Sequence, residues 1–136
     1  MRRKNPNVTN IAYRFLIKPR VEQRILFAKT FGCCRYVWNR MLHDKTEHYE
    51  ATKTMLNITP ATYKKDPVCP WLSEVDSLAL ANVQLELDSA YKAFFKKKSG
   101  FPNYKKKGGK KSYTTNNVNN NIVLTKNRLA LPKVGS

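Results

Sequence analysis

Residues 11–18 of this chain alternate between an apolar face and a mixed face that includes Arg14 and Lys18. The residues at odd positions, from Ile11 to Ile17, are all apolar and would share one face of an extended chain. This period of two predicts a half-buried β-strand. Pro19 ends the predicted strand, because proline has no amide hydrogen to donate to a sheet.

Helical spacing of apolar residues replaces this alternation from residue 20 onward. The pattern predicts one helix over about residues 20–31 and a second from Cys33 into the fifties, with Gly32 as the turn between them. Two helices joined at a glycine resemble a helix-turn-helix, although most such pairs are simply packed hairpins. The expected core-facing residues are Val21, Ile25, Ala28 and Phe31 in the first helix, and Cys34, Val37, Trp38, Met41 and Leu42 in the second.

Two further helices are predicted from their capping signals. Thr59 followed by Pro60 is a good helix start and predicts a short helix over about residues 60–65. Asp76 or Ser77 can cap a longer helix that runs to about Lys98, which we expect to be the central core helix. Its apolar face consists of Leu80, Val83, Leu87, Tyr91 and Phe94.

Two short apolar runs near the C-terminus, 122–125 and 128–131, predict a β-hairpin turned at Lys126 and Asn127, since asparagine tolerates the left-handed conformation of a tight turn. The strand over 11–18 needs a partner, and the other predicted strands lie beyond residue 110. The sequence therefore predicts an α+β fold. A helical bundle with a helix-turn-helix-like hairpin is inserted into a partial β-barrel formed by the N-terminal and C-terminal strands.

This arrangement divides the chain into three parts. Residues 1–19 form the first part of the β-lobe, residues 20–98 form the helical lobe, and residues 99–136 return to the β-lobe after a basic loop. The two ends of the chain would then lie in one neighbourhood.

Charge follows the same division. The formal net charge is +17. Residues 1–21 hold six bases and residues 89–136 hold twelve, without a carboxylate in either, whereas residues 22–88 hold nine acids and eight bases. This segregation favours a directed binding face for a polyanion, of which nucleic acid is the best candidate. Joining both ends in one lobe would make binding strongly salt-dependent.

Other function classes have less support in the sequence. No stretch approaches the roughly 18 apolar residues of a membrane span, and the N-terminus does not resemble a signal peptide, so a cytoplasmic protein is expected. Cys33, Cys34 and Cys69 form an odd set that predicts reduced thiols. The sequence contains no Ser/His/Asp set, phosphate-loop motif or metal-ligand spacing, so no catalytic and no metal-binding residue is predicted.

The segment from Lys96 to Asn117 has the composition of a nucleic-acid contact. Lysines supply charge, glycines let the main chain approach phosphates, and Ser, Thr and Asn supply short hydrogen-bonding groups. Tyrosines can stack on a base or sugar. A basic loop that is disordered until it binds remains an open alternative. The candidate binding residues are Lys96, Lys97, Lys98, Tyr104, Lys105, Lys106, Lys107, Lys110, Lys111 and Tyr113.

A series of short segments, which together cover nearly the whole chain, occurs in the same order as in a known protein family. They are residues 13–19, Gln23, and residues 30–39, 59–61, 63–65, 71–77, 90–95, 100–102, 105–107, 112–117 and 129–133. This series resembles the start of the TnpB (OrfB) proteins, the putative transposases of bacterial insertion sequences that form a family of RNA-guided DNA nucleases.

The resemblance implies a wedge-type β-lobe interrupted by a helical recognition-type lobe. Together these lobes would hold guide RNA and double-stranded target DNA, and contact a short motif beside the target. Cleavage in the family belongs to a later RuvC-like domain with a zinc-ribbon, so this chain alone is not expected to be an enzyme. Magnesium and zinc are expected only in those downstream domains, and nucleoid association in a bacterial cytoplasm follows from the family.

The resemblance also implies further contact residues by position. Arg35, Tyr36 and Asn39 are candidates for RNA or DNA contact. Candidates for the target-flanking duplex are Lys64, Ser77, Asn82, Thr114, Thr115, Asn116 and Asn119. Three interpretations stay open: part of a nuclease, a free-standing DNA-binding regulator without nuclease activity, or a non-functional truncated copy.

Overall fold

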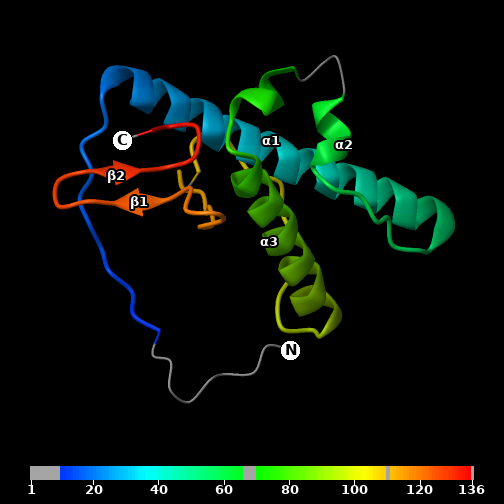
Figure 1. The fold of residues 1–136 in the computed structure, drawn as a ribbon. Coiled ribbons are helices and arrows are strands. Elements are labelled where there is room, and N and C mark those ends of the chain that lie inside the picture. The colour runs from blue at the N-terminus through cyan, green and yellow to red at the C-terminus, as the bar shows by residue number, and fades with distance from the viewer. Residues whose placement is uncertain (1–9, 66–69, 110, 136) are drawn as a thin grey trace.

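The structure is a computed structural model that describes residues 10–65, 70–109 and 111–135. The predictions made for Cys69 and Lys110 therefore lie outside the described residues. The described part is mostly helical, with one small two-stranded sheet (Figure 1). In chain order its elements are α1 (Val21–Thr52), α2 (Ala61–Lys64), the 3₁₀ helix η1 (Pro70–Glu74), α3 (Ser77–Phe95), β1 (Val123–Leu124) and β2 (Leu129–Ala130).

Helix α1 is one continuous helix of 32 residues, so the predicted break at Gly32 is wrong. A glycine inside a helix costs roughly 1 kcal/mol relative to alanine, which a well-packed helix can absorb. The buried stripe of α1 passes Gly32 without interruption, because Thr30 precedes it and Cys33, Cys34 and Val37 follow it. The predicted helix-turn-helix-like hairpin at this glycine does not form.

The first turns of α1 also bury a different face from the one predicted. Gln23 and Thr30 are buried, whereas Val21 and Ile25 are 67% and 55% exposed. Gln23 and Thr30 continue the helical spacing of the stripe further along α1, which fixes the face turned towards the core. The backbone N–H of Arg20 donates to Gln23 Oε1 at 2.8 Å and helps to fix the start of the helix.

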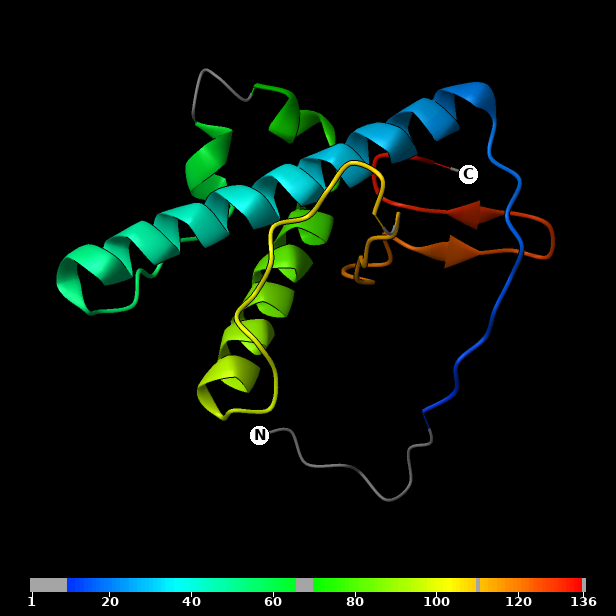
Figure 2. The same cartoon turned by 180° about the vertical axis from the view of Figure 1, so that it is seen from behind.

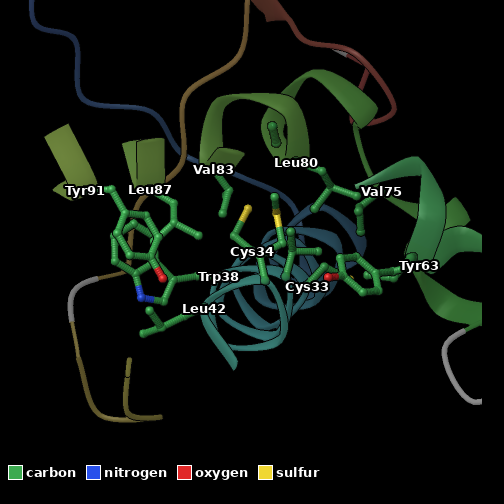
Figure 3. Close-up of a cluster of buried hydrophobic side chains, with 14 residues drawn as sticks. Cys33, Cys34, Trp38, Leu42, Tyr63, Val75, Leu80, Val83, Leu87 and Tyr91 are labelled. Atoms are coloured by element: carbon green, nitrogen blue, oxygen red, sulfur yellow. The ribbon is translucent and has the colours of Figure 1, made fainter. Parts of the chain in front are cut away.

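Helix α3 begins at Ser77 and packs in the core as predicted, but it ends at Phe95 and not at about Lys98. The Asp76 carboxylate caps it by accepting from the Leu78 N–H at 2.9 Å. The helix crosses α1, and their facing side chains form one cluster with Tyr63 of α2 and Leu72 of η1 (Figure 3). Figures 1 and 2 show α2 and η1 on one side of α1 and most of α3 on the other.

The predicted N-terminal strand is wrong. Residues 10–20 run as an extended segment without strand pairing, and the described sheet contains β1 and β2 alone. A strand is stabilised by hydrogen bonds to a neighbour, and alternation of side chains cannot supply that neighbour. The apolar side chains of this segment stay exposed, with Leu16 at 90%.

The C-terminal hairpin forms where it was predicted, although its strands are shorter. Val123 pairs with Ala130 and Leu124 with Leu129 in antiparallel register. The turn does not use a left-handed asparagine, because the Asn127 φ angle is not positive. Instead the Thr125 hydroxyl accepts from the Arg128 N–H at 3.2 Å and ties the turn together.

Candidate nucleic-acid interface

The lysine-rich segment forms a strap over the helix pair. We use the name strap for residues 103–116, of which residue 110 lies outside the described part. After α3 the chain reverses, with Lys97 in the left-handed conformation, and Phe101 packs edge-on against Phe94 and Tyr91. From there the chain runs back over α3 and across α1 (Figure 2).

The first clamp on the strap comes from α1. The Trp38 indole N–H donates to the Asn103 carbonyl oxygen at 2.8 Å. The Asn39 amide donates to the Lys105 carbonyl oxygen at 3.0 Å and accepts from the Lys105 N–H at 2.7 Å. The Lys105 ammonium lies 4.4 Å from the Trp38 ring centroid, within cation–π distance. Two adjacent residues of α1 thereby fix the backbone and one cation of the strap.

The second clamp comes from the start of α3. The Asn82 amide donates to the Thr114 carbonyl oxygen at 3.1 Å and to Asn116 Oδ1 at 2.6 Å. The Thr115 hydroxyl donates to the second oxygen of the Asp76 carboxylate, the group that caps α3. The strap is thus tied to both helices by side chains that lie far away in sequence.

The clamps leave strap cations at the surface. Lys106, Lys107 and Lys111 are exposed and line a pocket of about 470 Å³, which we call the strap groove. Arg35 and Gly32 of α1 line its other side. Lys96, Lys97 and Lys98 are exposed at the end of α3, where the strap begins its return. Among the described residues, the lysines predicted from composition are therefore exposed both at the end of α3 and along the strap.

The two strap tyrosines differ in exposure. Tyr104 is 54% exposed and remains accessible for stacking. Tyr113 is half-buried, with its ring centroid 6.1 Å from Phe27 and 5.9 Å from Phe31. Burial raises the pKa of the Tyr113 hydroxyl. The geometry favours Tyr104 as the stacking residue of this segment.

A second and larger pocket, of about 820 Å³, lies on the η1 side of α1, and we call it the α1 groove. Tyr36 and Trp71 meet edge to face in it, with ring centroids 5.1 Å apart. Arg35 lines this groove as well as the strap groove. Arg35, Tyr36 and Asn39, the candidates that the resemblance implied, lie on α1, and all three line the α1 groove.

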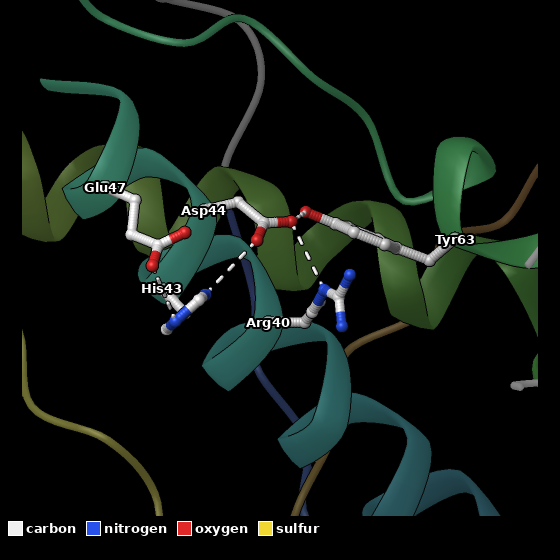
Figure 4. Close-up of polar contacts among 5 residues, drawn as sticks. All are labelled: Arg40, His43, Asp44, Glu47 and Tyr63. Atoms are coloured by element: carbon white, nitrogen blue, oxygen red, sulfur yellow. Dashed lines mark hydrogen bonds and ion pairs between the residues drawn. The ribbon is translucent and has the colours of Figure 1, made fainter. Parts of the chain in front are cut away.

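Figure 4 shows a polar cluster that ties α2 to α1. The Asp44 carboxylate accepts from the Tyr63 hydroxyl at 2.8 Å and pairs with Arg40 at 3.3 Å and His43 at 3.3 Å. The nearby Asp44 carboxylate raises the pKa of the Arg40 guanidinium, and burial raises the pKa of the Tyr63 hydroxyl. Lys64 follows Tyr63 and is half-buried on α2, apart from the strap.

The remaining candidates lie at element ends. Ser77 is the exposed first residue of α3. Asn119 and its neighbour Asn120 both have positive φ in a turn closed by the Asn121 N–H and the Val118 carbonyl oxygen at 3.2 Å. Asparagine suits that left-handed backbone better than most residues do. Asn119 and Asn120 therefore shape the chain after the strap.

Sequence reasoning missed two residues that position the strap. Trp38 was placed in the apolar stripe of α1, yet its indole N–H holds the strap backbone. Asp76 was recognised as a helix cap, yet it also holds Thr115. The indole N–H of a buried tryptophan needs a hydrogen-bond acceptor, and a carboxylate that caps a helix with one oxygen can accept a further hydrogen bond with the other. These two properties are the signals that could have identified Trp38 and Asp76.

The described residues include no helix long and apolar enough to cross a membrane. Within the same residues, no group of three or more His, Cys, Asp or Glu side chains is placed to hold a metal ion.

Comparison with known proteins identifies the class and then the family. A family model described as a helix-turn-helix domain, HTH_OrfB_IS605, matches residues 7–54. Helix-turn-helix domains are a class of DNA-binding module. The matched residues include α1, with Trp38 and Asn39, the two helix residues that hold the strap at the first clamp. The chain belongs to the TnpB (OrfB) family of insertion-sequence proteins, to whose N-terminal part it corresponds.

Three relatives give the extent of the match. The chain is 30% identical over 102 residues to "Putative RNA-guided DNA endonuclease InsQ" of Escherichia coli K12, and 30% over 99 residues to "Putative RNA-guided DNA endonuclease" of Streptomyces pristinaespiralis. These matches cover 71% and 69% of this chain and 25% of each relative. It is also 34% identical over 113 residues to "Virulence protein VsdF" of Salmonella dublin, covering 73% of this chain and 95% of that relative.

Proposed function

We propose that this chain is the nucleic-acid-binding N-terminal portion of an RNA-guided DNA endonuclease. In this role it holds guide RNA and double-stranded target DNA, and contacts a short motif beside the target. The names of two relatives and the family membership support the proposal. The match covers 25% of each of those relatives, so in this proposal cleavage belongs to regions that correspond to the rest of their length.

The clamped lysine strap is the observation that carries this proposal. Exposed lysines on a loop of fixed shape present several positive charges along one path, which suits a phosphate backbone. Asn39 and Asn82 use their amides on the strap backbone, so in this role they position the lysines. Thr114, Thr115 and Asn116 lie at the far clamp, where we propose that the target-flanking duplex approaches.

A charge-matched substitution experiment tests the strap. The variant Lys106→Gln, Lys107→Gln and Lys111→Gln removes three charges from the strap without touching a clamp. We expect it to lose about tenfold or more in affinity for RNA and to reduce the slope of log affinity against log salt by about two to three. Fluorescence anisotropy with a labelled RNA across a salt series measures both quantities.

The control removes three charges elsewhere. Lys53→Gln, Lys65→Gln and Lys92→Gln gives the same net charge and leaves the strap intact. An equal loss of affinity in both variants would mean that net charge, not the strap, governs binding. Enrichment of a transposon-end transcript among RNAs that co-purify with the chain would support the guide-RNA role specifically.

We also propose that the two ends of the chain form one wedge-type β-lobe around the helical lobe, with boundaries near residues 19 and 99. The apolar side chains of the N-terminal segment and the hairpin line a common pocket of about 600 Å³, which supports this arrangement. Phe15 and Ile17 contribute from one side, and Leu124 and Leu129 from the other. In this proposal magnesium and zinc serve downstream domains and not the present residues.

A second candidate function is a free-standing DNA-binding protein without nuclease activity. The relative VsdF favours it, because the match covers 95% of that protein. Two measurements separate the candidates: a search for RuvC-type carboxylates in the reading frame downstream of Ser136, and a DNA-cleavage assay of the chain with magnesium. A downstream nuclease frame supports the first candidate, and a genuine stop beside a retained guide-RNA locus supports the second.

A further inference from the structure

The α1 groove has the features of a second nucleic-acid site, on a different side of α1 from the strap. The described residues that line it include three cations, Lys29, Arg35 and Arg40, and no carboxylate. Its volume of about 820 Å³ falls in the range of ligand pockets, roughly 300–1,000 Å³. It therefore combines positive charge with room for a group the size of a nucleotide.

The cations follow the direction of the helix. Lys29, Arg40 and the intervening Tyr36 recur along one face of α1, so the cationic groups extend over roughly 16 Å at 1.5 Å per residue. Lys29 pairs with Glu74 at 3.2 Å and Arg40 with Asp44 at 3.3 Å, but these pairs are partly solvent-exposed. Exposed pairs are weak and easily exchanged for phosphate.

The aromatic pair offers a surface for a base. Tyr36 and Trp71 are both half-buried and meet edge to face within the groove. Stacking on such side chains requires a base that is not already paired and stacked in a duplex. This requirement favours a single-stranded segment over a double helix as the occupant.

Gly32 provides an independent observation. It lies in the interior of a 32-residue helix, where glycine is unfavourable, and it lines the α1 groove. A Cβ built on Gly32 would meet no atom within 4 Å, so packing among the described residues does not require glycine there. A bare helix backbone in open space allows a ligand to approach closely, which is a frequent reason for glycine.

We propose that the α1 groove binds a single-stranded nucleic-acid segment, with a base against Tyr36 and Trp71 and the sugar-phosphate backbone passing over Gly32 between Lys29 and Arg40. This proposal rests on the proposed nucleic-acid-binding function and assigns a second strand-binding surface within it. The strap and the α1 groove then hold different stretches of nucleic acid on two sides of one helix, with Arg35 reaching both.

Two variants of the full chain test the groove. Gly32→Gln adds a side chain over the proposed backbone path, at a residue that lines both the α1 groove and the strap groove. Because glutamine favours a helix, we expect a higher melting temperature together with weaker RNA binding, and the second variant assigns that loss to one groove. Lys29→Gln with Arg40→Gln removes charges that line the α1 groove and not the strap groove. We expect each variant to lose about tenfold in affinity for a labelled 12-nucleotide single-stranded RNA.

Three comparisons make the result decisive. Ala51→Gln, at an exposed position of α1 outside both grooves, is the control and should leave binding unchanged. If both groove variants bind RNA as tightly as the parent chain while the strap variant binds more weakly, the α1 groove is not a nucleic-acid site. The proposed function would still stand in that case. A parent chain that binds no nucleic acid would overturn the proposed function itself.

The kind of occupant is tested with the same variants. Selective loss of single-stranded RNA binding supports the proposal, whereas loss confined to a 12-base-pair duplex would overturn the single-stranded occupant. If polyglutamate displaces the labelled RNA as effectively as unlabelled RNA of equal charge does, the site recognises charge alone. That result would overturn the proposed base stacking. Inefficient displacement by polyglutamate supports it.

Discussion

The helix pair with its strap differs sharply from the N-terminal segment with the hairpin. Where α1 and α3 cross, apolar side chains are buried and each strap clamp has defined hydrogen-bond partners. In the N-terminal segment the apolar side chains from Ile11 to Ile17 are exposed, and the nearby sheet has two strands of two residues each. The first region carries its own core, whereas the second presents apolar surface without one.

The largest expected effect is a loss of the core at the helix crossing. Leu80 is fully buried, so Leu80→Ala should lower the free energy of unfolding by about 2–5 kcal/mol. Leu85→Ala is a matched control on the same helix, because Leu85 is 61% exposed. Urea denaturation followed by circular dichroism measures both. Equal losses for the two variants would mean that the crossing is not the core of the molecule.

The same contrast explains what the sequence predicted well. Helix α3 follows from local signals alone, since Asp76 caps it and its apolar residues recur at helical spacing. The C-terminal hairpin follows from two short apolar runs beside a turn. In both cases the interactions that define the element join residues close together in the chain.

The predictions that were wrong or missing depend on packing and on contacts between residues far apart in the chain. Gly32 is a local break signal, but it was outweighed by a buried stripe that continues on both sides. The clamps join residues that are 66, 32 and 39 positions apart, and polar side chains on distant backbone leave no periodic trace in the sequence. The lysines of the strap were evident from composition, whereas the contacts that hold the strap were not.

The next effect concerns Asp76, which serves α3 and the strap at once. Asp76→Ala removes a helix cap and the partner of Thr115, so we expect a loss of about 1–3 kcal/mol in the free energy of unfolding. Faster amide exchange over residues 113–116 should accompany it, measured by hydrogen-exchange mass spectrometry. Ser77→Ala, at the neighbouring exposed position, is the control and should leave strap exchange unchanged.

A smaller effect is expected from Cys34 at the helix crossing. Burial raises the pKa of the Cys34 thiol from 9.0 to about 12. The folded state therefore keeps this proton between those pH values, while the unfolded state loses it. Stability from this group is present below pH 9 and is lost as the pH rises towards 12. Native protein at pH 8 should resist alkylation by iodoacetamide at Cys34, whereas urea-unfolded protein should react fully; rapid native labelling would place the thiol outside the core.

The smallest expected effect lies in the N-terminal segment. Leu16 is 90% exposed, so Leu16→Ser should change the free energy of unfolding by no more than about 0.5 kcal/mol. The same urea titration measures it, with Leu80→Ala as the positive reference. A loss above 1 kcal/mol would show that this segment packs against the hairpin in solution, as the proposed wedge-type lobe requires when it is complete. A negligible loss means instead that the apolar side chains of the segment contribute stability only when a further surface covers them, since burial of apolar area is the source of that stability.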